Sequence, residues 1–221
     1  MAPSRNSWRA GLQYPRLPDV TTLQRMNSSQ ASETKPKLYV IAVSTRPGRA
    51  GFPLSTWIFE KAQAHGAFDV ELVDLKDVNL PMFDEPRHPR LRQYEHEHTK
   101  RWSAKIDAAD AFIFVTPEYD HGTPPSLINA LIYLVQEWAH KPVGFVSYGG
   151  PAGGTRAVQM VKPMLAALKM VPLFESVMAP LFLHSIDENG VFNPTEFQQT
   201  SAQAMLDGLG KWVGSLKALR S

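Results

Sequence analysis

Short apolar segments alternate with segments of helical character through most of this chain, and no other feature of the sequence restricts its fold so strongly. Leu38 to Val43 is a short apolar run of the kind found in strands buried on both faces. Four similar runs follow, each separated from the next by a segment that can be helical: 68–73, 111–115, 143–146 and 171–178. This alternation predicts an α/β fold with five parallel strands, right-handed crossovers and helices on both faces.

Apolar residues at helical spacing predict where the helices lie. One stripe begins after the first strand, with Leu54, Trp57 and Ile58. A second helix is predicted by Leu91, Tyr94, His98, Trp102 and Ile106. A third, closing the domain, is predicted by Phe197, Ser201, Met205, Leu209, Trp212 and Leu216. The segment Leu127 to Val135 is apolar almost all round, which fits either deep burial within the chain or a subunit interface.

Composition excludes several classes of function. The 23 basic and 21 acidic residues of the 221 are scattered along the chain, so nucleic acid is not an expected partner. No stretch approaches the roughly 18 apolar residues that span a bilayer, and the first residues lack the apolar core of a secretory signal. With no cysteine, disulfides, thiolate metal sites and a cysteine nucleophile are excluded, and redox chemistry would need a bound cofactor. We expect a soluble, cytoplasmic protein without membrane contact.

Residues 1–36 contain four prolines among polar residues and show no apolar period, so we predict a disordered or loosely docked arm preceding a domain at 37–221. Arginines outnumber acids in this arm, which leaves an organelle transit peptide as an alternative to a flexible tail.

Ligands of doubly wound sheets bind beyond the carboxyl ends of the strands. The loop Ser44 to Gly51 follows the first strand with two hydroxyls, Arg46, Arg49 and two glycines, next to a predicted helix start near Pro53. Arginines, glycine backbone and a helix N-terminus together favour phosphate, although a surface turn could have the same composition. The dinucleotide fingerprint and the lysine of the nucleoside-triphosphate loop are both missing here.

Two further loops follow the third and fourth strands. The loop 116–125 is stiffened by prolines, with Thr123 as a candidate N-cap and Tyr119 able to cover the face of a ring. The loop 147–156 has four glycines, against which a flat ligand could lie. A stiff connection and a flexible loop are the alternatives.

Together the three loops resemble the NADPH-dependent FMN reductase family of the flavodoxin-like fold, particularly its quinone and azo-dye reductase branch. The resemblance extends from about Leu38 to Pro180 and is carried by Ser44 to Arg49, Pro117 to Asp120 with Asn129-Ala130, and Glu137-Trp138 through Lys141-Pro142 to Ser147 to Gly150. It implies a three-layer sandwich with strand order 2-1-3-4-5, bound FMN, NADPH or NADH as co-substrate, and a homodimer or tetramer.

Carried over by position, the resemblance implies that Ser44 and Arg46 hold the FMN phosphate. The isoalloxazine ring and ribityl chain would contact Pro117, Glu118, Tyr119 and Asp120. The pyrimidine edge would be lined by Ser147, Tyr148, Gly149 and Gly150, with Gly153 of the same glycine loop counted among the cofactor-binding residues. Arg49 stands where many relatives have serine, and Asp120 where asparagine is commoner. Whether Arg49 serves FMN or NADPH stays open, and Arg46, Arg49 and Arg156 are candidates for a 2′-phosphate.

The implied reaction is ping-pong: a nicotinamide delivers hydride to the flavin and leaves, and a small acceptor such as a quinone, azo compound or flavin takes two electrons. No protein nucleophile, acid or base is needed, so we name no catalytic side chain. A flavodoxin-type electron carrier and a flavin-dependent redox-sensing interaction protein are the alternatives.

Residues 94–98 suggest a metal motif, but His96 and His98 are two apart and would point to different sides of a helix, so we expect no metal site. Trp102 is expected to pack in the core rather than to wall the flavin cleft. The run Pro81 to Pro89 resembles a mobile or subunit-bridging segment near that cleft.

Overall fold

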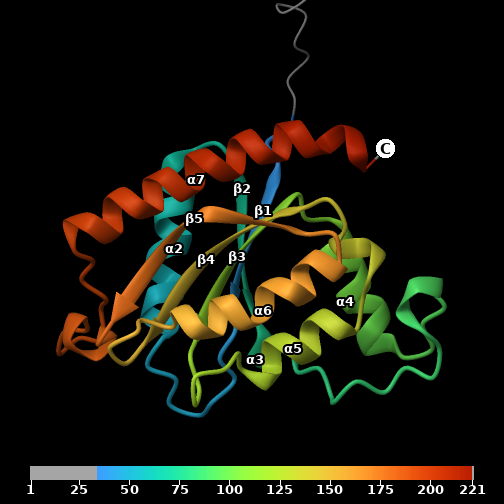
Figure 1. Cartoon of the computed structure of the whole chain (residues 1–221), viewed down its shortest axis with the longest axis horizontal. Helices are drawn as coiled ribbons and strands as arrows, with labels where there is room; N and C mark the ends of the chain where they lie inside the picture. The colour runs from blue at the N-terminus through green and yellow to red at the C-terminus, as the bar shows by residue number, and fades with distance from the viewer. Residues whose placement is uncertain (1–33, 221) are drawn as a thin grey trace, which may run out of the picture. The chain divides into compact units, whose positions relative to one another are not determined.

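The computed structural model describes residues 34–220, so the predicted arm and its transit-peptide alternative lie almost wholly outside the described residues. Five parallel strands form one sheet: β1 (Lys37–Ala42), β2 (Asp69–Asp74), β3 (Ala111–Pro117), β4 (Pro142–Gly149) and β5 (Val171–Pro180). Their order is β2-β1-β3-β4-β5 (Figure 1). This is the flavodoxin-like order, so the predicted fold is confirmed.

Helices cover both faces of the sheet. On one face, α2 (Phe52–His65) and α7 (Glu196–Leu216) bury their apolar residues against the strands. On the other lie α4 (Glu97–Asp107), α5 (Pro125–Ile132) and α6 (Thr155–Ala167) (Figure 1). Short helical turns complete the chain: α3 (Leu75–Val78), η1 (Pro89–Leu91), η2 (Gln136–Trp138), η3 (Phe182–Ser185) and η4 (Lys217–Leu219).

The apolar runs of the sequence reflect strands buried on both faces. Along β1, Tyr39 and Ile41 pack under α4 and α5, while Leu38 and Val40 pack under α2 and α7. All seven residues of β3 are buried as well. Burying one large apolar side chain contributes about 1.5–3 kcal/mol, so these central strands hold the layers together. Among the described residues, no helix is long and apolar enough to cross a membrane.

The helix predicted to include Leu91 and Tyr94 begins only at Glu97, so that part of the prediction is wrong. The cause is the carboxylate of Glu85, which accepts hydrogen bonds from the backbone N–H groups of Glu95 (2.8 Å) and His96 (3.1 Å). These bonds hold the chain in a non-helical path just before α4. Leu91 is accordingly 58% exposed in η1.

The two histidines of the discounted metal motif lie differently from the prediction. His96 is the N-cap of α4 and has extended backbone, so helical spacing does not apply to it. Its ring stacks on that of His98 with centroids 5.1 Å apart, and the Nε2 atom of His98 lies 3.0 Å from the carboxylate of Asp84. Within residues 34–220, no three histidine or acidic side chains are grouped so that they could hold one metal ion.

The predicted apolar stripe of the terminal helix is only partly buried. In α7, Met205, Leu209 and Leu216 are buried as expected, but Phe197 and Trp212 are 69% and 43% exposed. Their predicted places in the core are taken by Ala202, Leu206 and Val213.

The apolar segment around α5 is deeply buried within the chain, because Leu127, Leu131, Tyr133 and Leu134 are each at most 1% exposed. Trp102 packs in the core and donates a hydrogen bond to the carbonyl of Ala130 (3.0 Å), as predicted.

Lys141, which precedes β4, gives the fold a pH dependence. Its ammonium donates to the carbonyls of Ile106 (2.8 Å) and Asp107 (2.9 Å), and burial lowers the pKa of Lys141 from 10.5 to about 8. Between these two pH values the unfolded chain holds a proton that the folded chain has released. The free energy of unfolding therefore gains up to about 3 kcal/mol from this group as the pH rises through that interval.

We expect this gain to disappear in Lys141→Met. Urea unfolding of both proteins between about pH 7 and about pH 10 should show the stability difference moving in favour of the wild type as the pH rises. A difference that stays constant across this interval would show that the ammonium titrates normally.

Candidate functional site

A cavity of about 510 Å³ opens at the carboxyl edge of the sheet, between the loops that follow β1, β3, β4 and β5. We call it the carboxyl-edge cavity. Its volume falls within the range typical of small-molecule sites. Nine of the twelve predicted cofactor-binding residues line it: Ser44, Arg46, Arg49, Pro117, Glu118, Tyr119, Tyr148, Gly149 and Gly150. The other three, Asp120, Ser147 and Gly153, are not among the lining residues.

The loop after β1 combines a buried hydroxyl, an exposed guanidinium and the start of a helix. The hydroxyl of Ser44 lies 2.8 Å from that of Tyr119, which joins this loop to the one after β3. Helix α2 begins behind the loop with Pro53 in its first turn, and the amides of Phe52 and Leu54 donate to the carbonyls of Arg49 (3.4 Å) and Gly51 (3.2 Å). In the described part of the chain the Arg46 side chain has no ion pair, so its charge is available to a ligand.

The side chain of Arg49 is already paired within the chain. Its guanidinium forms an ion pair with Asp74 at the end of β2, donates to the carbonyl of Ser44 (3.3 Å) and lies 4.7 Å from the ring centroid of Phe52. The hydrogen bond to Asp74 raises the pKa of Arg49. Arg49 therefore braces the loop against the neighbouring strand, and its charge is matched before any ligand arrives.

Glu118 and Arg156 connect the second and third loops. The Glu118 carboxylate accepts from the guanidinium of Arg156 (2.6 Å) and from its backbone N–H (3.1 Å). Partial burial alone would raise the pKa of Glu118, but these bonds outweigh it and lower the pKa below its usual value. Arg156 is thus paired within the chain, like Arg49.

Asp120 shapes a turn instead of lining the cavity. The backbones of Tyr119 and Gly122 exchange two hydrogen bonds (3.1 and 2.8 Å), and between them Asp120 and His121 have φ angles of 46° and 66°. This is a two-residue hairpin turn in which both central residues are left-handed, a geometry that asparagine and aspartate tolerate. Thr123 is not the predicted N-cap: Pro124 takes that position, and the Thr123 hydroxyl donates to the Ala157 carbonyl (2.6 Å).

The glycine loop has two parts with different environments. Gly149 and Gly150 line the cavity, and a Cβ added to Gly150 would meet nothing within 4 Å. Gly153 is left-handed (φ 57°), a Cβ added to it would lie 3.0 Å from the Pro180 backbone, and its carbonyl accepts from the Ser147 hydroxyl (2.7 Å). The hydrogen bond between Ser147 and Gly153 therefore stabilises the loop at a point outside the cavity lining.

One wall of the carboxyl-edge cavity was not predicted from the sequence. It lies after β5 and consists of Leu181, Phe182, Leu183 and His184. The signal that could have found it is positional, because this segment follows the fifth predicted strand and so reaches the same edge as the other loops. The Phe182 ring lies 4.8 Å from that of Tyr148, which attaches the wall to β4.

The ring of Tyr148 packs against Gly51, the N-cap residue of α2. An added Cβ at Gly51 would lie 2.0 Å from the Tyr148 ring, so only glycine permits this approach. The ring is 5% exposed, and burial, followed by the proximity of Tyr119, raises the pKa of Tyr148. Tyr148 is therefore neutral at physiological pH.

Residues 36–183 match the protein family described as NADPH-dependent FMN reductase. An NAD(P)H-dependent FMN reductase of Schizosaccharomyces pombe is 46% identical over 137 residues, covering 61% of this chain and 68% of the relative. A quinone reductase of Pseudomonas putida is 29% identical over 158 residues, covering 68% and 81%. The solved structure of FerB, a flavoenzyme NAD(P)H:(acceptor) oxidoreductase from Paracoccus denitrificans, shares the fold with a TM-score of 0.65 at 20% identity, covering 81% of this chain and 98% of that one.

The contact between Gly51 and Tyr148 predicts a large difference between two glycines of the cavity. Gly51→Ala should lower the free energy of unfolding by about 1–3 kcal/mol, because the buried ring must move. Gly150→Ala, whose new methyl group enters open space, should change it by less than about 0.5 kcal/mol. Urea unfolding of the two variants measures this, and equal losses would contradict the packing described here.

Proposed function

This chain belongs to the NADPH-dependent FMN reductase family, and we propose that it binds FMN in the carboxyl-edge cavity and uses it to pass two electrons from a nicotinamide to a small acceptor. That the chain is an NAD(P)H-dependent FMN reductase follows from its family and relatives. The observation that supports the proposed binding site is the convergence of the three predicted loops on one cavity of suitable volume.

The phosphate of FMN would lie on the loop after β1. Arg46 provides an unpaired guanidinium, and the nearby start of α2 provides the positive end of the helix dipole. Gly48 belongs to the same loop, lines the cavity and has φ 65°. An added Cβ there would meet nothing within 4 Å, so a ligand can approach its backbone closely. The residues present therefore fit a phosphate group.

The isoalloxazine ring would lie between the loops after β3 and β4. Pro117 and Tyr119 offer flat surfaces on one side, and open space lies beside Gly150 on the other. The backbone amide of Glu118 donates to the Tyr148 carbonyl (3.1 Å), which fixes the spacing between the two loops. A planar ring system fits this arrangement.

Bound FMN would supply the redox chemistry, accepting hydride from a nicotinamide and passing two electrons to an acceptor. The chain's own residues bind, orient and exclude water. Tyr148 stays protonated and forms part of the floor, while Leu181 and Leu183 provide an apolar wall against which a visiting ring can pack. We name no side chain as a general acid or base.

The size of the cavity favours a ping-pong order. A volume of about 510 Å³ is suited to one cofactor, so the nicotinamide and the acceptor would use the same exposed face in turn. Quinones, azo compounds and flavins are planar acceptors that could use that face, and one relative is named a quinone reductase. A homodimer or homotetramer remains part of the proposal, supported by the exposed Leu181 and Leu183 beside the cavity.

Arg49 and Arg156 are both paired with carboxylates, which leaves no unpaired arginine other than Arg46 among the described cavity residues. If Arg46 holds the FMN phosphate, the 2′-phosphate of NADPH meets no dedicated guanidinium. We therefore propose that NADH and NADPH reduce the enzyme at similar rates.

Reconstitution with FMN tests the enzyme directly. The yellow protein should be reduced by NADPH without any partner reductase, and the reduced protein should be reoxidised by a quinone. Stopped-flow absorbance should give rate constants for NADPH and NADH within about tenfold, which corresponds to 1.4 kcal/mol. FMN binding without reduction by either nicotinamide would support an electron carrier and overturn the reductase mechanism.

Arg46→Ala should weaken FMN binding at least about tenfold, because a charge-assisted pair to phosphate is lost. Fluorescence titration of FMN measures the dissociation constant. Arg101→Ala removes the same charge from an exposed position on α4 outside the cavity and serves as the matched control. Equal affinity of the Arg46 variant and the control for FMN would show that the phosphate binds in another part of the site.

A further inference from the structure

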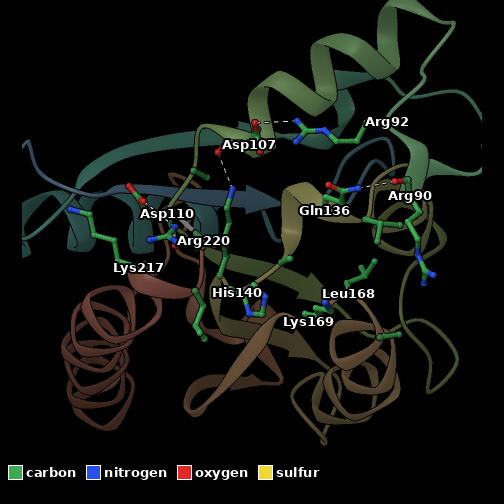
Figure 2. Close-up of a pocket in the computed structure, with 16 residues that line it drawn as sticks. Arg90, Arg92, Asp107, Asp110, Gln136, His140, Leu168, Lys169, Lys217 and Arg220 are labelled. Atoms are coloured by element: carbon green, nitrogen blue, oxygen red, sulfur yellow. Dashed lines mark hydrogen bonds and ion pairs between the residues drawn. The ribbon is translucent and has the colours of Figure 1, made fainter.

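A second and larger cavity, of about 1000 Å³, lies at the opposite edge of the sheet (Figure 2). We call it the amino-edge cavity, because Asp110, Lys141 and Lys169 line it directly before or close to the starts of β3, β4 and β5. The rest of its lining comes from η1, η2 and the turn after it, the ends of α4 and α6, and the segment near η4. It shares no lining residue with the carboxyl-edge cavity.

Positive charge dominates this cavity. Its lining includes two carboxylates, Asp107 and Asp110, and six cationic side chains together with His140: Arg90, Arg92, Lys141, Lys169, Lys217 and Arg220. Both carboxylates are already paired, Asp107 with Arg92 (3.1 Å) and Asp110 with Arg220 (3.0 Å). Arg92 also lies 3.3 Å from the carboxylate of Glu137, and Lys141 donates to two backbone carbonyls, so a ligand would pair chiefly with Arg90 and Lys169.

Two of the cations have fixed backbones and unpaired side chains. The carbonyl of Arg90 accepts from the Gln136 side chain (2.7 Å), and that of Lys169 accepts from the His140 backbone (2.9 Å). Within residues 34–220, neither the Arg90 guanidinium nor the Lys169 ammonium has an ion pair, and both residues are exposed. In the view of Figure 2, Arg90 and Arg92 lie on one side, Lys217 and Arg220 on the other, and His140 and Lys169 between them.

Three residues that line this cavity have left-handed backbone. Arg92, His140 and Lys169 have φ angles of 51°, 58° and 58°, a conformation that favours glycine. Any side chain in this conformation is less favourable than glycine. Lys169 follows the end of α6, where glycine is the usual residue. A lysine there retains an ammonium group at the cavity despite the cost.

We propose that the amino-edge cavity binds a small phosphate-bearing polyanion, recognised chiefly by Arg90 and Lys169. Arginine pairs with phosphate oxygens through two parallel hydrogen bonds, and lysine adds a mobile point charge. The volume admits a molecule up to about the size of a nucleotide. This site does not depend on FMN or on the proposed reaction.

Isothermal titration calorimetry of the full chain with inorganic tripolyphosphate, at about 0.15 M salt so that weak surface attraction is screened, tests the proposal. The wild type should bind saturably with a dissociation constant below about 1 mM. Arg90→Ala combined with Lys169→Ala should weaken binding at least about tenfold. The charge-retaining pair Arg90→Lys and Lys169→Arg should bind within a few-fold of the wild type, which separates lost charge from lost folding.

A matched control, Arg101→Ala with Lys211→Ala, removes the same net charge from exposed positions outside the cavity and should change binding less than about twofold. The proposal is overturned if the control loses as much affinity as the cavity pair, or if the wild type does not saturate. It is also overturned if Arg46→Ala abolishes binding while the Arg90 and Lys169 pair does not, since the ligand would then occupy the carboxyl-edge cavity. Equally tight binding of citrate would refute the assignment to phosphate.

Discussion

Burial of the central strands on both faces is the constraint from which the rest of this structure follows. Because β1 and β3 are covered above and below, almost no polar group can be placed on either face of the sheet without losing its hydrogen bonds to water. Polar and charged side chains therefore gather at the two edges where the strands begin and end. Both cavities of about 510 and 1000 Å³ are found at these edges.

At the carboxyl edge, the loops are tied to one another by pairs that neutralise most of their own charge. Arg49 is joined to Asp74, Arg156 to Glu118, and the Tyr148 ring is seated on Gly51. These contacts connect segments that are far apart in the sequence and leave the cavity shaped before a ligand binds. Preorganisation of this kind reduces the ordering cost of binding. It also distinguishes Arg46, which has no such pair, from the other arginines nearby.

The sequence predicted the strands, the fold and most of the cavity lining, because alternating patterns and loop positions are local properties that one chain displays directly. Errors arose where a distant partner decided the outcome. The carboxylate of Glu85, ten residues before Glu95, delays the start of α4. No local pattern identifies Asp74 as the partner of Arg49. The wall Leu181 to His184 was missed for another reason, since its residue types carry no phosphate or flavin signal.

The helix dipoles offer a competing explanation for the cations at the amino edge. Helices α4 and α6 end there, and the negative partial charge of their last carbonyls attracts cations. Lys141 fits this explanation, because its ammonium donates to the carbonyls of Ile106 and Asp107 at the end of α4. Lys169 directly follows the C-cap of α6, so the dipole of that helix also favours its charge, whereas Arg90 lies in η1 and ends neither helix. The dipoles thus account for the buried lysine, while Arg90 and Lys169 keep exposed charges that an anion from outside the chain can pair with.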